Sequence, residues 1–150
     1  QRPRRPAAPL IVYVDTAALV PLLIDEPTTI ACGELWDSAD RVTVTRLGYI
    51  EAVAALAQAE RLGRISATEV RQGQSVLDDL WAVVDVIELD EALSLEAARL
   101  AIAHGLRGYD ATHCAAAVAA SDTELVAVSG DTKLLAAWRT EGLATHDLNA

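Results

Sequence analysis

Short apolar runs alternate with longer helical patterns along the chain. Runs rich in Val, Ile and Leu predict buried β-strands at residues 10–14, 41–44, 83–89 and 124–129. Between them, a short helical stretch opens at Asp15-Thr16, and helical patterns follow over 27–39, 46–62, 66–80, 90–104, 110–121 and 132–140. Strands that alternate with helices favour a parallel sheet with right-handed crossovers. We therefore expect one α/β domain, with a central parallel sheet of about four or five strands flanked by helices.

Several of the predicted helices have recognisable ends. Ser66 and Glu69 have the spacing of a capping box, in which each side chain bonds to the other residue's backbone N–H. Asp90 is placed to cap the helix that runs to His104, and Gly142 follows the last helix as a stop. Pro27 is expected in the first turn of its helix.

Composition is that of a globular domain with an unusual acidic surplus. Hydrophobic residues make up 52% of the 150 residues, which is enough for a real core. The first nine residues, QRPRRPAAP, are basic and Pro-rich, so we expect a flexible segment at 1–9 and the domain at 10–150. The net charge of −10 does not suit a broad basic nucleic-acid surface. The surplus serves solubility, or it gathers in a cleft for cations or a basic partner peptide.

The cysteines and the hydropathy indicate the compartment. Cys32 and Cys114 are far apart, with no CxxC pair or histidine at ligand spacing, so a zinc site is not expected. Two buried free thiols favour a reducing compartment, and we expect a cytoplasmic protein. No apolar run reaches the roughly 18–20 residues of a membrane span, so no membrane association is expected.

Four acidic residues stand where the chain changes from one element to the next. Asp15 follows the first predicted strand, and Asp131 lies two residues beyond the fourth. Because parallel strands present their carboxyl ends at one edge, both should lie on the same rim. Glu51 lies on a predicted helix with no Lys or Arg three or four positions away, and Asp110 begins another helix.

Each acid also has a structural interpretation. Asp15, Asp110 and Asp131 are all placed to cap helices, and Glu51 could belong to a solvated helix face. Taken together, however, four carboxylates without matching cations would repel one another unless a divalent ion joined them. Oxygen ligands without thiolates suit Mg²⁺ or Mn²⁺. The chemistry that follows is phosphodiester hydrolysis by a metal-activated water.

Four segments in order resemble a known family. The sequences VYVDTAALV, TRLGYIE with its T-x-L-x-x-x-E spacing, LRGYDATHCAAA and VSGDTKLL resemble PIN-domain ribonucleases, and most closely the VapC toxins of bacterial toxin–antitoxin pairs. The resemblance spans about residues 10–145. It implies a single PIN-like domain in which Asp15, Glu51, Asp110 and Asp131 bind metal and catalyse, supported by the hydroxyl groups of Thr16 and Ser129.

The resemblance also implies a substrate and partners. It predicts an endoribonuclease (a hydrolase) that uses Mg²⁺ or Mn²⁺ to cleave tRNA or rRNA. It predicts a homodimer that forms a heterotetramer or larger assembly with a cognate antitoxin, whose basic C-terminal segment enters the acidic cleft. The chain departs from the pattern at Gly130, where many relatives carry a bulkier residue; this could loosen Asp131.

Three further residues are candidates for contact with RNA. Arg46 and Arg107 flank the proposed site in sequence and could bind phosphates, although an ordinary surface position is the simpler interpretation. His113 lies one helical turn after Asp110 and could contact substrate or support the site from behind.

Other functions remain open at this stage. A phosphatase that uses Asp15 as nucleophile would need a second acid at position 17, which is Ala, and a receiver domain would need a separate strand ending in lysine. The non-enzymatic alternative is a binding module whose acidic cleft holds a basic partner peptide. Metal-dependent RNA cleavage distinguishes it from a nuclease.

Overall fold

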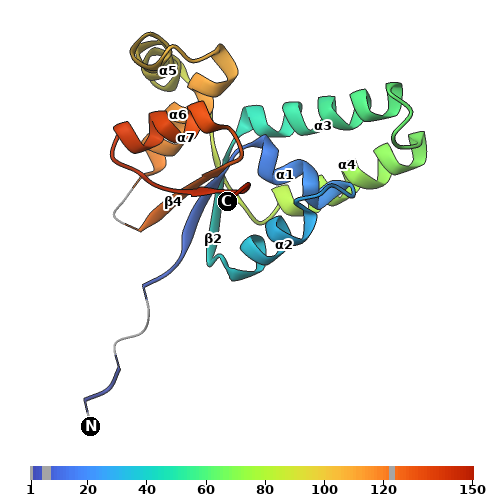
Figure 1. Ribbon diagram of the computed structural model, residues 1–150, viewed down its shortest axis with the longest axis horizontal. Coiled ribbons are helices and arrows are strands. Elements are labelled where there is room, and N and C mark those ends of the chain that lie inside the picture. Colours follow the sequence, from blue (N-terminus) through green and yellow to red (C-terminus); the bar gives the residue numbers. More distant parts are fainter. Residues whose placement is uncertain (1, 5–7, 122–123) are drawn as a thin grey trace.

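A five-stranded, fully parallel sheet forms the centre of the molecule (Figure 1). The computed structural model describes residues 2–4, 8–121 and 124–150. The strand order is β3-β2-β1-β4-β5, and each neighbouring pair runs parallel. The strands are β1 Ile11–Val14, β2 Arg41–Thr45, β3 Asp85–Ile87, β4 Leu125–Ser129 and β5 Ala144–Asp147. The α/β fold with a parallel sheet expected from the sequence is confirmed.

Helices connect the strands as the apolar pattern predicts. They are α1 Thr16–Leu23, α2 Thr29–Ser38, α3 Arg46–Arg61, α4 Ala67–Trp81, α5 Glu91–His104, α6 Gly108–Ala120 and α7 Thr132–Thr140. Two expected boundaries were wrong. Strand β3 is shorter than 83–89, because Val83 continues a turn that closes α4. Pro27 precedes α2 instead of lying in its first turn, since Thr28 occupies the N-cap.

The helix ends follow from local hydrogen bonds. The Glu69 N–H donates to Ser66 Oγ over 3.1 Å, and the Ser66 N–H donates to Glu69 Oε1 over 3.2 Å, which completes the capping box. Asp90 Oδ1 accepts from the Leu93 N–H over 2.8 Å at the start of α5. Gly105 ends α5 with φ 61°, a left-handed conformation that costs glycine little.

The two faces of the sheet carry separate cores. Tyr13, Leu100 and Trp138 belong to the cluster that packs α5, α6 and α7 against one face. Val12, Val14 and Leu19 share the cluster on the other face, under α1 and α2. Residues of β1 alternate between the two clusters because successive strand side chains point to opposite faces. Strand β1 is therefore buried on both sides, at the middle of the sheet.

Helices α3 and α4 form a hairpin that projects from the sheet (Figure 1). Leu56 of α3 and Leu77 of α4 are fully buried in the described structure. A side chain at Gly73 would place its Cβ 3.1 Å from the Leu56 methyl groups, so glycine permits the close approach of the two helices.

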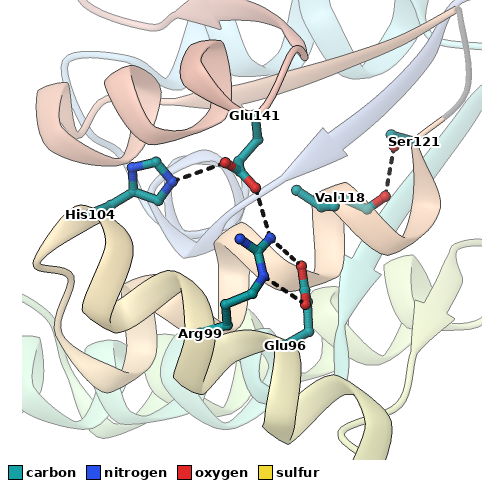
Figure 2. A network of polar contacts seen from close by, with 6 residues as sticks. All are labelled: Glu96, Arg99, His104, Val118, Ser121 and Glu141. Carbon is teal, nitrogen blue, oxygen red and sulfur yellow. Dashed lines mark hydrogen bonds and ion pairs between the residues drawn. The ribbon is translucent and has the colours of Figure 1, made fainter.

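Polar contacts tie α5 to α7 and to the loop before α6. Glu141, at the end of α7, accepts a hydrogen bond from Arg99 over 2.9 Å and lies 3.2 Å from His104 Nε2 (Figure 2). Lys133 Nζ of α7 donates to the Gly105 carbonyl over 2.6 Å. The Lys133 bond joins the start of α7, which follows Asp131, to the loop that leads into α6 and Asp110.

No helix within residues 2–4, 8–121 and 124–150 is long and apolar enough to cross a bilayer. The flexible segment expected at 1–9 stays a prediction, because residues 1 and 5–7 lie outside the described residues.

Candidate active site

The strand order changes direction between β1 and β4, which are neighbours at the centre of the sheet. From β1 the chain passes to β2 and β3 on one side, then returns to β4 and β5 on the other. In open α/β sheets, ligands bind at such a switch point, beyond the carboxyl ends of the strands. Asp15 follows β1 there, and Ser129 ends the adjacent β4. The rim predicted from the sequence therefore forms at this edge.

Asp15 is the buried member of the four acids. It is 6% exposed, and Ser129 Oγ donates to its Oδ2 over 2.5 Å. Its Oδ1 is buried and has no hydrogen-bond partner among the described residues. Burial raises the pKa of Asp15 to about 6, although the Ser129 hydrogen bond acts in the opposite direction. The side chain does not cap α1, so the capping interpretation fails for this residue.

Glu51 faces the rim from α3 and binds two side chains through one oxygen. Thr16 Oγ1 donates to Glu51 Oε1 over 2.9 Å, and His113 Nε2 lies 2.5 Å from the same oxygen. Burial acts to raise the pKa of Glu51, but the hydrogen bonds from His113 and Thr16 bring it below its ordinary value. The carboxylate therefore lies in a polar niche formed with Thr16 and His113, and not on a solvated helix face.

Asp131 and Asp110 form the more open part of the site. Asp131 Oδ1 accepts from the Leu134 N–H over 2.9 Å, so this residue does cap α7. Its backbone N–H donates to Ser129 Oγ over 2.9 Å, and it lines a cavity of 350 Å³. Asp110 lies in the first turn of α6, and its pKa is raised by burial and then by the charge of Asp131. The two carboxylates therefore act on one another.

Gly130 fits a close contact with the C-terminal segment. Asn149 Nδ2 donates to the Gly130 carbonyl over 3.1 Å, and a Cβ at this position would lie 3.0 Å from the same nitrogen. The backbone before Asp131 is thus held by Asn149, while the Asp131 N–H is held by Ser129. Glycine here allows the contact, and Asp131 is held from both sides.

The two candidate arginines differ in their surroundings. Arg46 pairs with Glu88, and its Nε lies 3.1 Å from Glu88 Oε2. Arg107 precedes α6, is exposed, and lowers the pKa of Asp110 through its charge. Within the described part of the chain, no hydrogen bond or ion pair engages the Arg107 side chain. Arg107 is therefore the more available cation beside the acids.

Sequence reasoning missed Tyr13, which contacts the site from inside the sheet. Its hydroxyl lies 2.8 Å from His113 Nδ1, while the other ring nitrogen of His113 meets Glu51. His113 is 3% exposed, so it lies behind the rim. The available signal was a tyrosine in the middle of an otherwise aliphatic strand, two residues before Asp15 and hence on the same side of the strand.

The residues present fit a cation chemically. Within residues 2–4, 8–121 and 124–150, no group of three or more His, Cys, Asp or Glu side chains is arranged as a ready-made metal site. The unpartnered buried Oδ1 of Asp15 nevertheless calls for a compensating positive charge. Glu51 also raises the pKa of Asp15 and of Asp110, so the acids share one electrostatic environment. By contrast, a cavity of 480 Å³ beside β3 and α5 contains none of them.

Sequence comparison covers most of the chain with one family model. The model of the PIN domain matches residues 12–137, a range that includes Asp15, Glu51, Asp110 and Asp131. The chain belongs to the PIN-domain family. The resemblance inferred from the four segments is thereby confirmed, as is the single PIN-like fold.

Several named proteins resemble this chain over most of its length. Ribonuclease VapC45 of Mycobacterium tuberculosis is 38% identical over 124 residues, which cover 83% of this chain and 86% of the relative. The crystal structure of the M. tuberculosis toxin VapC20, which cleaves the sarcin-ricin loop, aligns with a TM-score of 0.66 at 20% identity, over 84% of this chain and 94% of that one. VapBC2 of Rickettsia felis, bound to a promoter DNA fragment, aligns with a TM-score of 0.64 at 14% identity, over 92% and 98%.

Proposed function

We propose that this PIN-domain protein is a divalent-metal-dependent endoribonuclease and acts as the toxin of a toxin–antitoxin pair. The family match and the 38% identity to a VapC ribonuclease support RNA cleavage as the reaction class. The observation that carries the mechanism is the buried Asp15 carboxylate at the sheet switch point, with one oxygen held by Ser129 and the other unpartnered in the described structure. We propose residues 10–150 as the nuclease domain.

In this proposal Asp15, Glu51, Asp110 and Asp131 hold Mg²⁺ or Mn²⁺ and form the catalytic site. The ion would supply positive charge to the scissile phosphate and lower the pKa of a water molecule. Ser129 orients Asp15 through Oδ2, and Thr16 orients Glu51 through Oε1. Asp131 uses Oδ1 to cap α7, which fixes its position on the rim. The oxygen-only donor set suits these hard cations.

The proposed substrate is tRNA or rRNA. Its phosphates would meet an acidic rim, so binding needs both the cation and a nearby basic group. Arg107 fits this role because it is exposed and close enough to Asp110 to lower the pKa of that carboxyl group. Arg46 is largely neutralised by Glu88 and contributes less.

We expect Arg107→Gln to raise KM for RNA roughly five- to tenfold, as the loss of about 1–1.4 kcal/mol from one exposed hydrogen bond would. The slope of log binding constant against log salt concentration should also become shallower by about one, because one phosphate contact is lost. Steady-state cleavage at several salt concentrations measures both. Arg46→Gln provides the comparison and should change KM by less than about twofold. A larger effect from Arg46→Gln than from Arg107→Gln would contradict this assignment.

The proposed partners are a cognate antitoxin and a second copy of the chain. An antitoxin with a basic C-terminal segment would satisfy the charge of the acidic rim. A homodimer, and a heterotetramer or larger complex with antitoxin, is supported by exposed apolar residues on α5. Leu95 and Ile102 are 66% and 86% exposed and lie two turns apart on one face. The two free cysteines, both buried, agree with the reducing cytoplasm as the site of action.

The direct test uses protein purified without its partner. With Mg²⁺ or Mn²⁺ it should cleave structured RNA at defined positions, which sequencing of the cut ends identifies. EDTA should stop the reaction, and added Mn²⁺ should restore it. RNA cleavage that persists in EDTA would refute the metal mechanism. Tight binding of a basic peptide without any cleavage would instead favour the non-catalytic binding module.

A further inference from the structure

Tyr13 is a buried hydroxyl group that the proposed mechanism leaves without a role. Its side chain is 0% exposed, and its ring meets the Trp138 ring edge-on at 5.8 Å between centroids. Its oxygen lies 2.8 Å from His113 Nδ1. Burial raises the pKa of Tyr13 well above its ordinary value, so the hydroxyl keeps its proton at every pH at which the enzyme would work.

The surroundings of Tyr13 set the direction of this hydrogen bond. The hydroxyl is fully buried, and its hydrogen-bond contact among the described residues is with His113. The single phenol proton must then find an acceptor, because a buried O–H without one is unfavourable. His113 Nδ1 is the acceptor within reach. Tyr13 therefore donates and Nδ1 accepts.

This direction fixes the proton on the other side of the imidazole ring. When Nδ1 accepts, the neutral ring carries its proton on Nε2. Nε2 lies 2.5 Å from Glu51 Oε1 and therefore donates to it. Thr16 Oγ1 donates to the same oxygen over 2.9 Å. Among the described residues, the hydrogen bonds of the Glu51 carboxylate thus fall on Oε1, and Oε2 is left for another ligand.

We propose that Tyr13 acts as a positioning residue: it sets the tautomer of His113, which holds Glu51 Oε1 and leaves Oε2 for the cation. This inference rests on the proposed metal-dependent function. It also assigns His113 a role, because a ring nitrogen that carries a proton cannot coordinate a metal. His113 is then a positioning residue as well, and neither a metal ligand nor a contact for RNA. Outer partners of this kind typically change metal affinity by about 10–100-fold.

The test compares variants by their affinity for Mn²⁺, measured calorimetrically on the full chain without partner. Tyr13→Phe keeps the ring against Trp138 and should weaken Mn²⁺ binding about tenfold. Tyr49→Phe is the matched control, since Tyr49 also packs edge-on against a tryptophan and donates to Asp78 over 2.6 Å, outside the site. It should bind Mn²⁺ as the wild type does. His113→Gln, whose amide N–H can replace Nε2–H, should retain more affinity than His113→Leu.

A second measurement reports the tautomer without any metal. Long-range ¹H–¹⁵N NMR of histidine-labelled wild type should show His113 Nδ1 unprotonated and Nε2 protonated, and Tyr13→Phe should lose this preference. A protonated Nδ1 in the wild type, or unchanged Mn²⁺ affinity in Tyr13→Phe, would overturn the inference. Wild type that neither binds Mn²⁺ nor cleaves RNA would overturn the proposed function itself. Wild type that does both while Tyr13→Phe equals it would overturn only the role of Tyr13.

Discussion

Asp15→Asn is expected to reduce RNA cleavage by at least about a hundredfold while the protein stays folded. Asparagine has nearly the same shape as aspartate, and its amide oxygen can still accept the hydrogen bond from Ser129. It lacks the negative charge that the proposed cation needs at the switch point. The measurement is the rate of cleavage of a mapped RNA site at saturating Mg²⁺, together with the circular dichroism spectrum of each protein.

Asp37→Asn is the matched control for this prediction. Asp37 is exposed near the end of α2, immediately before the chain enters β2, and hence at the opposite edge of the sheet from Asp15. Asp37→Asn also removes one negative charge, and it should leave the rate of RNA cleavage within about twofold of the wild-type rate. If Asp15→Asn cleaved RNA as fast as Asp37→Asn does, the assignment of Asp15 to the catalytic site would be wrong.

The stability of the protein without divalent ions should depend on the protonation of Asp15. The pKa of Asp15 is raised from 3.8 to about 6 by burial. Between those values the unfolded chain releases the proton while the folded protein keeps it, so this group's contribution makes the folded state less stable as pH rises from about 4 to 6. At about 1.4 kcal/mol per pKa unit, the loss amounts to up to about 3 kcal/mol above pH 6.

Urea unfolding in EDTA at pH 4 and pH 7.5 tests this expectation. The difference in unfolding free energy between Asp15→Asn and wild type should shift in favour of the variant by up to about 3 kcal/mol between the two pH values. Added Mn²⁺ should stabilise the wild type at pH 7.5 more than the variant, because only the wild type keeps the charge. A difference that stays constant with pH, with or without Mn²⁺, would contradict the account of Asp15 as a carboxylate whose charged form is disfavoured by burial.

Most elements of the fold follow from local sequence. The capping box of Ser66 and Glu69 and the Asp90 cap are made by side chains close in sequence, and the Gly142 stop by a positive φ that glycine adopts readily, so their positions are predictable. The length of strand β3 was less predictable. The run at residues 83–89 extends beyond the three residues, Asp85, Val86 and Ile87, that pair with β2. How many residues pair depends on the position of the neighbouring strand, which the run itself does not encode. The apolar pattern thus predicted that the element exists, but not its length.

The sequence singled out four candidate acids but did not predict their contacts. Asp15, Glu51, Asp110 and Asp131 stand out because acids next to apolar elements need an explanation. Which of them act as caps depended on side-chain geometry: Asp131 bonds to the Leu134 N–H, and Asp15 makes no such bond. The likeness to a PIN domain supplied the order of the acids, and the comparison with the family confirmed that likeness.

The sequence by itself determined the α/β class, the alternation of strands and helices, and the four acids, because these depend on local propensity and on the spacing of polar residues. Only the tertiary structure decided how those acids are supported. Tyr13 and His113 are 100 residues apart, and His113 and Glu51 are 62 apart. Hydrogen bonds over such separations arise when β1, α3 and α6 pack together, and hydrogen bonds are directional. Their existence depends on distances of a few ångströms, which no local pattern encodes.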